Sequence, residues 1–272
     1  MAKIWLDMPG AGPPIHRCVS EALERIGHTV SGVDPDMRIG IWQVGMPVPV
    51  EGPPLVRWWT GSDVGCLAAG RTSVHSHDER LNWVGCERLR HELACLGLAA
   101  RTLPIVPAWD PLLCPMPDRP RVMAYCPDGS EALYRWGDVC YVIDACPEFD
   151  FAIYRKTLVG ERLVPPNVTM CGTVCHDGML VEYLRSSAVL RLVQSDGASL
   201  SVLEALTFGR HVVWSHVAMP GCRQADDWYQ AAVQLRAVLA SGEPNVEGFD
   251  AMVTLRRAAD GKLAKYVGDV IH

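Results

Sequence analysis

Short apolar runs alternate with amphipathic stretches along most of the chain. Residues 3–8 (KIWLDM) are mostly apolar, apolar side chains then recur with helical spacing over residues 15–26, and residues 28–30 resume a strand-like run. A strand buried in a parallel sheet is nearly continuously apolar, whereas a helix that covers the sheet has one apolar face. The opening of the chain therefore predicts a strand, a helix and a second, parallel strand joined by a right-handed crossover.

The same alternation continues to the end of the chain. We predict further strands at residues 38–44, 55–59, 81–84, 101–106, 122–125, 151–154, 168–170, 190–193 and 211–214. We predict further helices at residues 87–96, 131–145, 177–187, 200–208, 226–239 and 251–267. Short strands that alternate with helices are typical of doubly wound, Rossmann-like α/β sheets.

One segment interrupts this pattern. Residues 108–121 (AWDPLLCPMPDRPR) contain four prolines and no periodicity, which is typical of a linker between domains. We therefore expect a first Rossmann-like domain over residues 1–107 and a second over residues 122–255. Residues 256–272 are expected to form a C-terminal helix that packs back on the first domain. Because ligands of open α/β sheets bind at the carboxyl ends of the strands, we expect a site in a cleft between the domains.

Composition and charge exclude some classes of protein. Of the 272 residues 49% are hydrophobic and the formal net charge is −6, which permits a large core and argues against broad, sequence-independent binding to a polyanion. No apolar run is long enough to cross a membrane, and the N-terminal residues MAKIWLDMPG lack the apolar region of a signal peptide. We therefore expect a cytoplasmic protein.

The eleven cysteines are scattered through the chain, and no Cys-x-x-Cys occurs. Cysteines of this kind in a reducing compartment are usually small, buried hydrophobic side chains. Cys171 and Cys175 with His176 are the one cluster with metal-ligand chemistry. Without a second cluster it predicts no zinc site, and we expect no metal.

Motifs of three other α/β classes are missing. The turn at residues 9–14 (PGAGPP) does not match the Gly-x-Gly-x-x-Gly of dinucleotide-binding domains, and neither Gly-x-Ser-x-Gly nor Gly-x-x-x-x-Gly-Lys occurs. The chain is therefore not expected to be a nicotinamide-dependent dehydrogenase, an α/β-hydrolase or a P-loop NTPase. The turn itself is either a ligand contact or a plain connection between strand and helix.

Residues 190–215 (LRLVQSDGASLSVLEALTFGRHVVWS) carry the most informative pattern. They predict a buried strand, a turn of small and polar residues, a helix that ends at Gly209, and a second buried strand. Asp196 lies in the turn and Glu204 lies within the helix. A turn that contains glycine and leads into a helix N-terminus directs backbone N–H groups and a positive dipole end toward a ligand.

This stretch resembles the nucleotide-binding domain of GT-B glycosyltransferases, in particular glycosyltransferase family 4. That family has an acid, seven intervening residues and a Glu-Ala pair, followed by a strand of the Gly-x-Pro-Val-Val type. The matching residues here are 196–213 (DGASLSVLEALTFGRHVV). The resemblance implies a GT-B fold of two Rossmann-like domains that face each other across a cleft. It also implies transfer of a sugar from a nucleoside-diphosphate sugar to a hydroxyl acceptor, with retention and without a metal or other cofactor.

The resemblance assigns roles to individual residues. Glu204 would bind the ribose, and Asp196, in place of the family's first Glu, would meet hydroxyls of the donor sugar. The other implied donor-binding residues are Gly10, Ala11, Gly12, Thr173, Gly197, Ala198, Ser199 and Leu200. Two structural alternatives stay open: Glu204 is a salt-bridged acid on the helix surface, or Asp196 is the N-cap of the helix.

The chain departs from the family where the donor diphosphate is neutralised. Family members place an Arg and a Lys just after the first strand of the second domain, but residues 125–131 here (YCPDGSE) contain neither. Arg155, Lys156, Arg210 or Arg57 would then substitute for them. Otherwise the leaving group depends on the helix dipole alone, which is weak support for catalysis.

The first domain offers few acid or base candidates. Asp63 lies in a turn after an apolar strand, where it either faces the cleft or caps the next helix. His75 and His77 either line the cleft or belong to a solvated loop. The catalytic candidates are therefore Asp63 and Asp196.

The acceptor cannot be read from the sequence, and two other functions remain open. One is a phage-type DNA glycosyltransferase that acts on hydroxymethylated bases, which requires a basic, aromatic groove. Residues that could form part of such a groove are Arg57, Trp58, Trp59, Arg71, Arg80 and Arg88. The structural alternative for the Trp58-Trp59 pair is one ring in the core and one on the surface. The second function is a nucleotide-binding GT-B homologue without catalysis.

Overall fold

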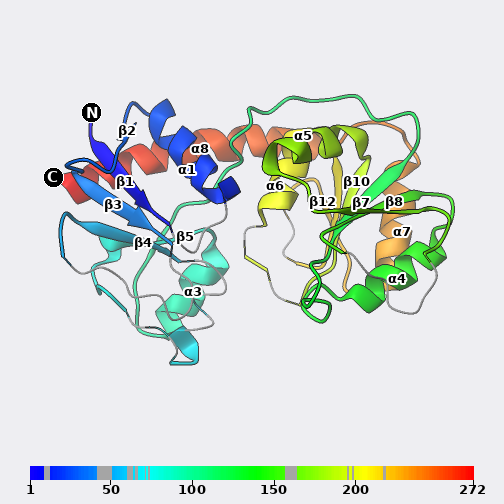
Figure 1. The fold of residues 1–272 in the computed structure, drawn as a ribbon, viewed down its shortest axis with the longest axis horizontal. Helices are drawn as coiled ribbons and strands as arrows, with labels where there is room; N and C mark the ends of the chain where they lie inside the picture. Colours follow the sequence, from blue (N-terminus) through cyan, green and yellow to red (C-terminus); the bar gives the residue numbers. More distant parts are fainter. Residues whose placement is uncertain are drawn as a thin grey trace. The chain divides into compact units, whose positions relative to one another are not determined.

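The fold consists of two compact units, which the chain enters in the order first, second, first. The structure is a computed structural model that describes residues 1–8, 13–41, 51–59, 64, 67–70, 72, 74–156, 164–194, 196–197, 199–216 and 219–272. Unit 1 comprises Met1–Ala108 and Leu255–His272, and unit 2 comprises Trp109–Thr254 (Figure 1). Each unit is built around a parallel, six-stranded sheet, so the predicted α/β class is confirmed.

The sheet of unit 1 has the strand order β2-β1-β3-β4-β5-β6, and all described pairings are parallel. Its strands are β1 (Lys3–Asp7), β2 (Thr29–Val30), β3 (Met37–Gly40), β4 (Leu55–Trp59), β5 (Asn82–Val84) and β6 (Arg101–Thr102). Its helices are α1 (Pro13–Arg25), the 3₁₀ helix η1 (Glu79–Leu81), α3 (Glu87–Cys95) and the part of α8 (Val246–Ile271) from Leu255 onward.

Two consecutive tryptophans on β4 anchor the two faces of this sheet. Trp58 packs in a cluster with residues of α1 and with Leu263 of α8, whereas Trp59 packs in a separate cluster with Leu93 of α3. Neighbouring side chains of a strand point to opposite faces, and helices cover both faces here. The structural alternative with one ring in the core and one on the surface is therefore wrong, because Trp58 and Trp59 are both buried.

The sheet of unit 2 has the strand order β12-β11-β10-β7-β8-β9, again with parallel pairings. Its strands are β7 (Arg121–Tyr125), β8 (Asp150–Tyr154), β9 (Val168–Gly172), β10 (Ala188–Arg191), β11 (His211–Trp214) and β12 (Cys222–Gln224). Its helices are α4 (Trp136–Ala145), α5 (His176–Arg185), α6 (Leu200–Thr207), α7 (Trp228–Leu239) and the start of α8.

Helices cover both faces of the unit 2 sheet. Val139 of α4 and Leu235 of α7 share one apolar cluster with Leu190 of β10 and Val213 of β11. Figure 1 shows α5 and α6 side by side on the opposite face from α4 and α7. A sheet covered on both faces requires apolar side chains on both, which explains the nearly continuous apolar runs of its central strands.

Several elements begin or end away from their predicted bounds. The strand expected at 190–193 is β10 (Ala188–Arg191), so a charged residue occupies its last position. The helix expected from residue 131 starts at Trp136, because residues 131–135 form turns and Arg135 adopts a left-handed conformation with φ 46°. The helix expected at 251–267 extends over Val246–Ile271.

Gly221 lies where two backbone segments of unit 2 approach closely. It has φ +80°, and a Cβ on it would come within 2.3 Å of Gly248 Cα and 2.9 Å of Asn245 Oδ1. Gly221→Ala is expected to lower the free energy of unfolding by about 3 kcal/mol, because a left-handed alanine adds to a displacement of the first turn of α8. Gly242→Ala, with φ +66° and no atom within 4 Å of the added Cβ, is the control and should cost only about 1 kcal/mol. Urea unfolding measures both, and equal losses would contradict the close approach.

Candidate functional site

The centre of the unit 2 sheet contains a reversal of strand order. β7 and β10 are neighbours, and the chain adds β8 and β9 on one side but β11 and β12 on the other. In open parallel sheets, ligands bind outside the carboxyl ends of the strands at such a reversal. The residues that follow β7 and β10 are therefore the first candidates for a ligand site.

A largely buried ion pair lies at the end of β10. Arg191, the last residue of the strand, donates from Nε to Asp196 Oδ2 at 2.6 Å. The guanidinium also lies over the ring of Tyr134, 5.3 Å from its centroid. Burial opposes the charge of Arg191, but Asp196 and Tyr134 together outweigh burial, so the pKa of the guanidinium is raised. Arg191 was not predicted as a site residue, although a charged residue within an apolar run was a signal for it.

Residues just after β11 form hydrogen bonds with the turn that carries Asp196. The backbone N–H of Asp196 donates to His216 Nε2 at 2.6 Å, and His216 Nδ1 lies 2.9 Å from the carbonyl oxygen of Ser215. The Ser215 hydroxyl accepts from the N–H of Val193 and donates to the carbonyl of Val193, both at 2.8 Å. Ser215 and His216, which follow the neighbouring strand β11, therefore fix the chain at Val193 and at Asp196.

The N-terminus of α6 follows this turn, and the side chain of its N-cap residue makes no capping hydrogen bond. Ser199 is the N-cap residue, but its hydroxyl bonds to that of Ser201 at 3.1 Å and caps no backbone N–H. The alternative in which Asp196 is the N-cap residue is therefore wrong, because Ser199 holds that position. The Asp196 carboxylate pairs with Arg191. Gly197 lies between Asp196 and the helix, and Ala198 lies outside the described residues.

Glu204 is a buried carboxylate on α6, with a side chain only 5% exposed. Its Oε1 lies 2.8 Å from His176 Nε2 at the start of α5, and its Oε2 accepts from the Tyr183 hydroxyl at 2.7 Å. The alternative of a solvent-exposed acid is therefore wrong. Burial, together with the charge of Glu204, raises the pKa of Tyr183 well above its usual value, so Tyr183 remains a hydrogen-bond donor. A carboxylate has about four acceptor positions, so two remain for a ligand.

Aromatic rings surround the Glu204 side chain. Trp109 stacks on His176 with ring centroids 4.4 Å apart, and it also contacts Tyr183 and Phe208. This cluster joins the first residue of unit 2 to helices α5 and α6. Its members are distant in the sequence, so no local pattern predicts it. It keeps water away from the carboxylate and strengthens its hydrogen bonds.

Lys156 is held by two acids that follow β7. Its ammonium donates to Asp128 Oδ1 at 2.8 Å and to Glu131 Oε1 at shorter distance. Burial lowers the pKa of Lys156, but these two partners outweigh burial and raise it overall. The ammonium therefore lies beside the segment 125–131, which lacks an Arg or Lys of its own, but its charge is already offset by two carboxylates.

Arg155 and Thr173 lie at the same edge of the sheet. Arg155 follows β8, is exposed, and has a left-handed backbone with φ 61°. Its N–H donates to the carbonyl of Gly172, the last residue of β9, at 2.7 Å. Thr173 follows directly and is exposed, so both predicted residues lie at the carboxyl ends of β8 and β9.

Arg210 is not a phosphate-binding candidate. It precedes β11, at the amino end of the strand, whereas the candidate site lies beyond the carboxyl ends. It is buried, and its guanidinium donates to the carbonyls of Pro115 at 2.8 Å and Leu184 at 3.5 Å. Burial lowers the pKa of Arg210, and the side chain ties residues 109–120 to the end of α5.

The predicted residues of unit 1 are only partly described. Asp63 and the turn of Gly10, Ala11 and Gly12 lie outside the described residues. His75 Nε2 donates to the carbonyl of Leu55 at 3.1 Å, at the amino end of β4, and burial lowers the pKa of His75. His77 is exposed. The two histidines therefore do not lie together at the carboxyl ends of the strands.

The residues considered for a DNA groove do not form one. Arg57 is buried with its guanidinium 3.7 Å from the Trp59 ring centroid, and Trp58 is buried on the other face. Exposed Arg80 and half-buried Arg88 form ion pairs within unit 1, with Asp78 at 2.8 Å and Glu92 at 2.7 Å. Arg71 lies outside the described residues. The groove prediction is therefore wrong for the described residues, because its aromatic side chains belong to the core.

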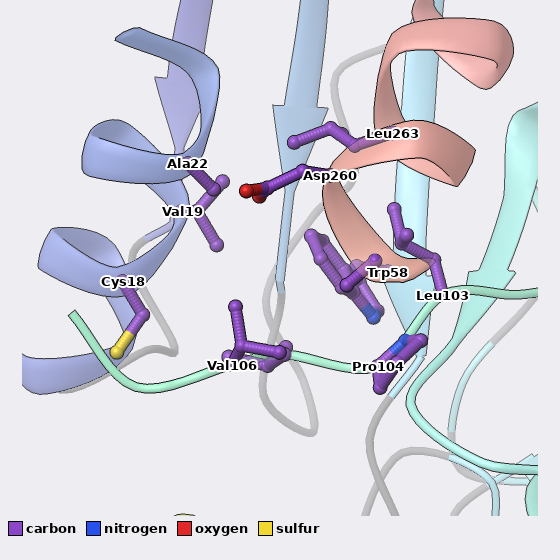
Figure 2. A pocket seen from close by; sticks show the side chains of 11 residues that line it. Cys18, Val19, Ala22, Trp58, Leu103, Pro104, Val106, Asp260 and Leu263 are labelled. Carbon is purple, nitrogen blue, oxygen red and sulfur yellow. The ribbon is translucent and has the colours of Figure 1, made fainter. Parts of the chain in front are cut away.

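A small hollow in unit 1 is a packing gap rather than a nucleotide site. It lies between α1, α8 and the segment after β6, and Figure 2 shows Val19, Trp58 and Leu263 among the apolar side chains around it. Its charged side chain, Asp260, pairs with Arg25 at 3.0 Å. The lining thus offers no cation for a phosphate.

His176 faces Glu204 rather than joining Cys171 and Cys175, and no group of three His, Cys, Asp or Glu residues in the described part of the chain could hold a metal ion. Within the same part, no helix is both long and apolar enough to span a membrane.

Comparison by sequence identifies no relative. A scan against protein-family models finds no match, and a search of curated proteins finds none either.

Comparison by structure gives full-length matches. Sucrose-phosphate synthase from Thermosynechococcus elongatus is 12% identical with a TM-score of 0.68, and the match covers 99% of each chain. AviGT4, a glycosyltransferase involved in avilamycin A biosynthesis, is 15% identical with a TM-score of 0.66 over 100% of this chain and 98% of its own. Anabaena HepE in complex with UDP and glucose is 11% identical with a TM-score of 0.63 over 99% of this chain and 100% of its own. The chain therefore has the GT-B fold of two Rossmann-like domains.

Proposed function

We propose that this protein is a glycosyltransferase that moves a sugar from a nucleoside-diphosphate sugar to a hydroxyl acceptor. The observation that carries the proposal is the full-length GT-B match to glycosyltransferases, one of them solved with UDP and glucose. Membership of glycosyltransferase family 4 is supported by Asp196 and Glu204, which have the family's spacing and lie at and near the N-terminus of α6.

In this proposal unit 2 binds the donor and unit 1 binds the acceptor. Glu204 accepts the two ribose hydroxyls with the acceptor positions that His176 and Tyr183 leave open. Asp196 accepts a hydroxyl of the donor sugar, and the N-terminus of α6 directs backbone N–H groups toward the phosphates. Among the described residues, these N–H groups belong to Gly197, Ser199 and Leu200.

The donor diphosphate then needs a cation. Arg155 is the exposed candidate at the carboxyl end of β8, together with Thr173 as a neutral donor. Lys156 contributes less because Asp128 and Glu131 already offset its charge. The α6 dipole adds only about 0.3–1 kcal/mol at an exposed site, so we expect a low turnover number.

A second candidate function is nucleotide binding without turnover. It is favoured because Asp128 and Glu131 already offset the charge of Lys156. One of the two cations that would stabilise the leaving group, Arg155 and Lys156, is then lost to it. The buried, hydrogen-bonded Glu204 fits both candidates, since both require a carboxylate for the ribose.

Release of nucleoside diphosphate from a panel of sugar nucleotides tests the proposal. We expect release with at least one donor, and nuclear magnetic resonance of the product should show the anomeric configuration of the donor if transfer occurs with retention. Binding of a nucleotide sugar without release under any condition would support the second candidate. Neither binding nor release with any donor would contradict both functions.

Asp63 remains the proposed acid or base of unit 1. Its test is Asp63→Asn in the same assay, with the exposed Asp34→Asn of unit 1 as control. We expect loss of transfer only in Asp63→Asn, and equal activity of the two variants would contradict a catalytic role.

A further inference from the structure

The turn at Asp196 depends on one protonation state of a neighbouring histidine. The carbonyl oxygen of Ser215 only accepts, so the 2.9 Å contact requires the proton of His216 on Nδ1. The backbone N–H of Asp196 only donates, so the 2.6 Å contact requires an unprotonated Nε2. A neutral imidazole with its proton on Nδ1 satisfies both partners, and no other state of the ring does.

Asp196 is therefore fixed in two independent ways. His216 holds its backbone, while Arg191 holds its carboxylate through a 2.6 Å hydrogen bond from Nε.

We infer that His216 and Arg191 are positioning residues of the donor site, which set the orientation of Asp196 toward the donor sugar. This inference rests on the proposed function. It assigns to His216 a role that acts through Asp196 rather than through contact with the donor. His216 follows β11 and lies outside the Asp-x₇-Glu pattern in the sequence. In this inference it positions Asp196, the first acid of that pattern.

The position of the turn supports this role. Asp196 lies between the last residue of β10 and the N-terminus of α6, so a change in the turn alters both the carboxylate and the N–H groups that follow. The Ser215 hydroxyl adds two hydrogen bonds with the backbone of Val193, which lies three residues before Asp196. Reacting and binding groups need placement to within a fraction of an ångström, which such paired contacts supply.

The test compares His216→Gln with His216→Leu by calorimetry. Gln presents a side-chain oxygen near the position of Nε2 and can accept from the Asp196 N–H, whereas Leu has similar bulk and no acceptor. We expect His216→Leu to weaken binding of the nucleotide sugar by about tenfold and of the nucleoside diphosphate alone by less than about threefold. His216→Gln should bind the nucleotide sugar within about threefold of the unchanged protein.

The outcomes separate the inference from the proposed function. Equal nucleotide-sugar affinities in His216→Leu and the unchanged protein would overturn the inference and leave the function standing. The same holds if His216→Gln binds as poorly as His216→Leu. Absence of all nucleotide binding in the unchanged protein would overturn both.

A second measurement needs no variant. Nitrogen-15 resonances of the histidine rings report the tautomer of each imidazole, and Gln and Leu variants serve only to assign the His216 signal. A neutral ring with its proton on Nδ1 is expected, and a proton on Nε2 would overturn the inference even if His216→Leu failed to fold.

Discussion

Glu204→Ala is expected to weaken binding of a nucleoside diphosphate at least a hundredfold. In the proposed complex two ribose hydroxyls donate to one buried carboxylate, and each hydrogen bond to a charged group contributes about 1.5–3 kcal/mol. The site is shielded by Trp109 and by the other rings near His176, so water cannot replace the lost acceptor at low cost. Isothermal titration calorimetry with UDP and the other nucleoside diphosphates measures the change.

Glu182→Ala is the matched control. Glu182 is also a carboxylate of unit 2 that accepts from a tyrosine hydroxyl, that of Tyr154, but it lies outside the proposed donor site. Both variants leave a tyrosine hydroxyl without its acceptor, so both should lose stability, while only Glu204→Ala should lose the nucleotide. The double variant Glu204→Ala/Tyr183→Phe removes the stranded hydroxyl and should recover stability without recovering binding. Equal nucleotide affinity in Glu204→Ala and Glu182→Ala would contradict a ribose role for Glu204.

The parallel α/β fold could be predicted because the local signals agree with the packing. Residues 55–59 (LVRWW) and 211–214 (HVVW) are nearly continuous apolar runs, and both are strands covered by helices. The short β12 (Cys222–Gln224) was missed, since a three-residue edge strand with exposed polar side chains has no distinctive pattern. Edge strands are paired on one side only, so their sequences carry less information.

The site was harder to predict because its contacts join distant residues. Asp128 and Glu131 contact Lys156 only when β7 pairs with β8. No local sequence pattern shows that these two carboxylates offset the charge of the lysine. Arg210 was misjudged for a related reason. It is close in sequence to the Asp196 turn, but α6 carries the chain from the carboxyl edge of the sheet back to the amino edge before Arg210 is reached.

The burial of Glu204 was easier to predict than its hydrogen-bond partners. An acid between Leu203 and Ala205, on a helix between two buried strands, is expected to be partly buried. Its partners His176 and Tyr183 lie 28 and 21 residues earlier, and their spacing of seven residues on α5 places both on one helix face. That spacing is visible in the sequence, but only the structure shows which carboxylate the face meets.

Asp196→Ala is expected to lower the free energy of unfolding by about 3 kcal/mol or more, because the guanidinium of Arg191 then stays buried without its counter-charge. The side chains of Arg191 and Asp196 are 13% and 12% exposed, and their atoms lie 2.6 Å apart. Arg191→Met removes the buried charge on the other side and fills similar volume. The double variant Arg191→Met/Asp196→Ala should therefore be more stable than Asp196→Ala alone, since no uncompensated charge remains.

The pair of Arg236 and Glu148 supplies the control for this prediction. It belongs to the same unit and has the same 2.6 Å separation, but its side chains are 47% and 43% exposed. Because water screens an exposed pair, Glu148→Ala should cost no more than about 1 kcal/mol. Urea unfolding of Asp196→Ala, Arg191→Met, the double variant and Glu148→Ala gives all four values. If Asp196→Ala costs no more than Glu148→Ala, the Arg191–Asp196 pair is open to water, and the rigid turn on which donor recognition depends would have to be held by His216 and Ser215 alone.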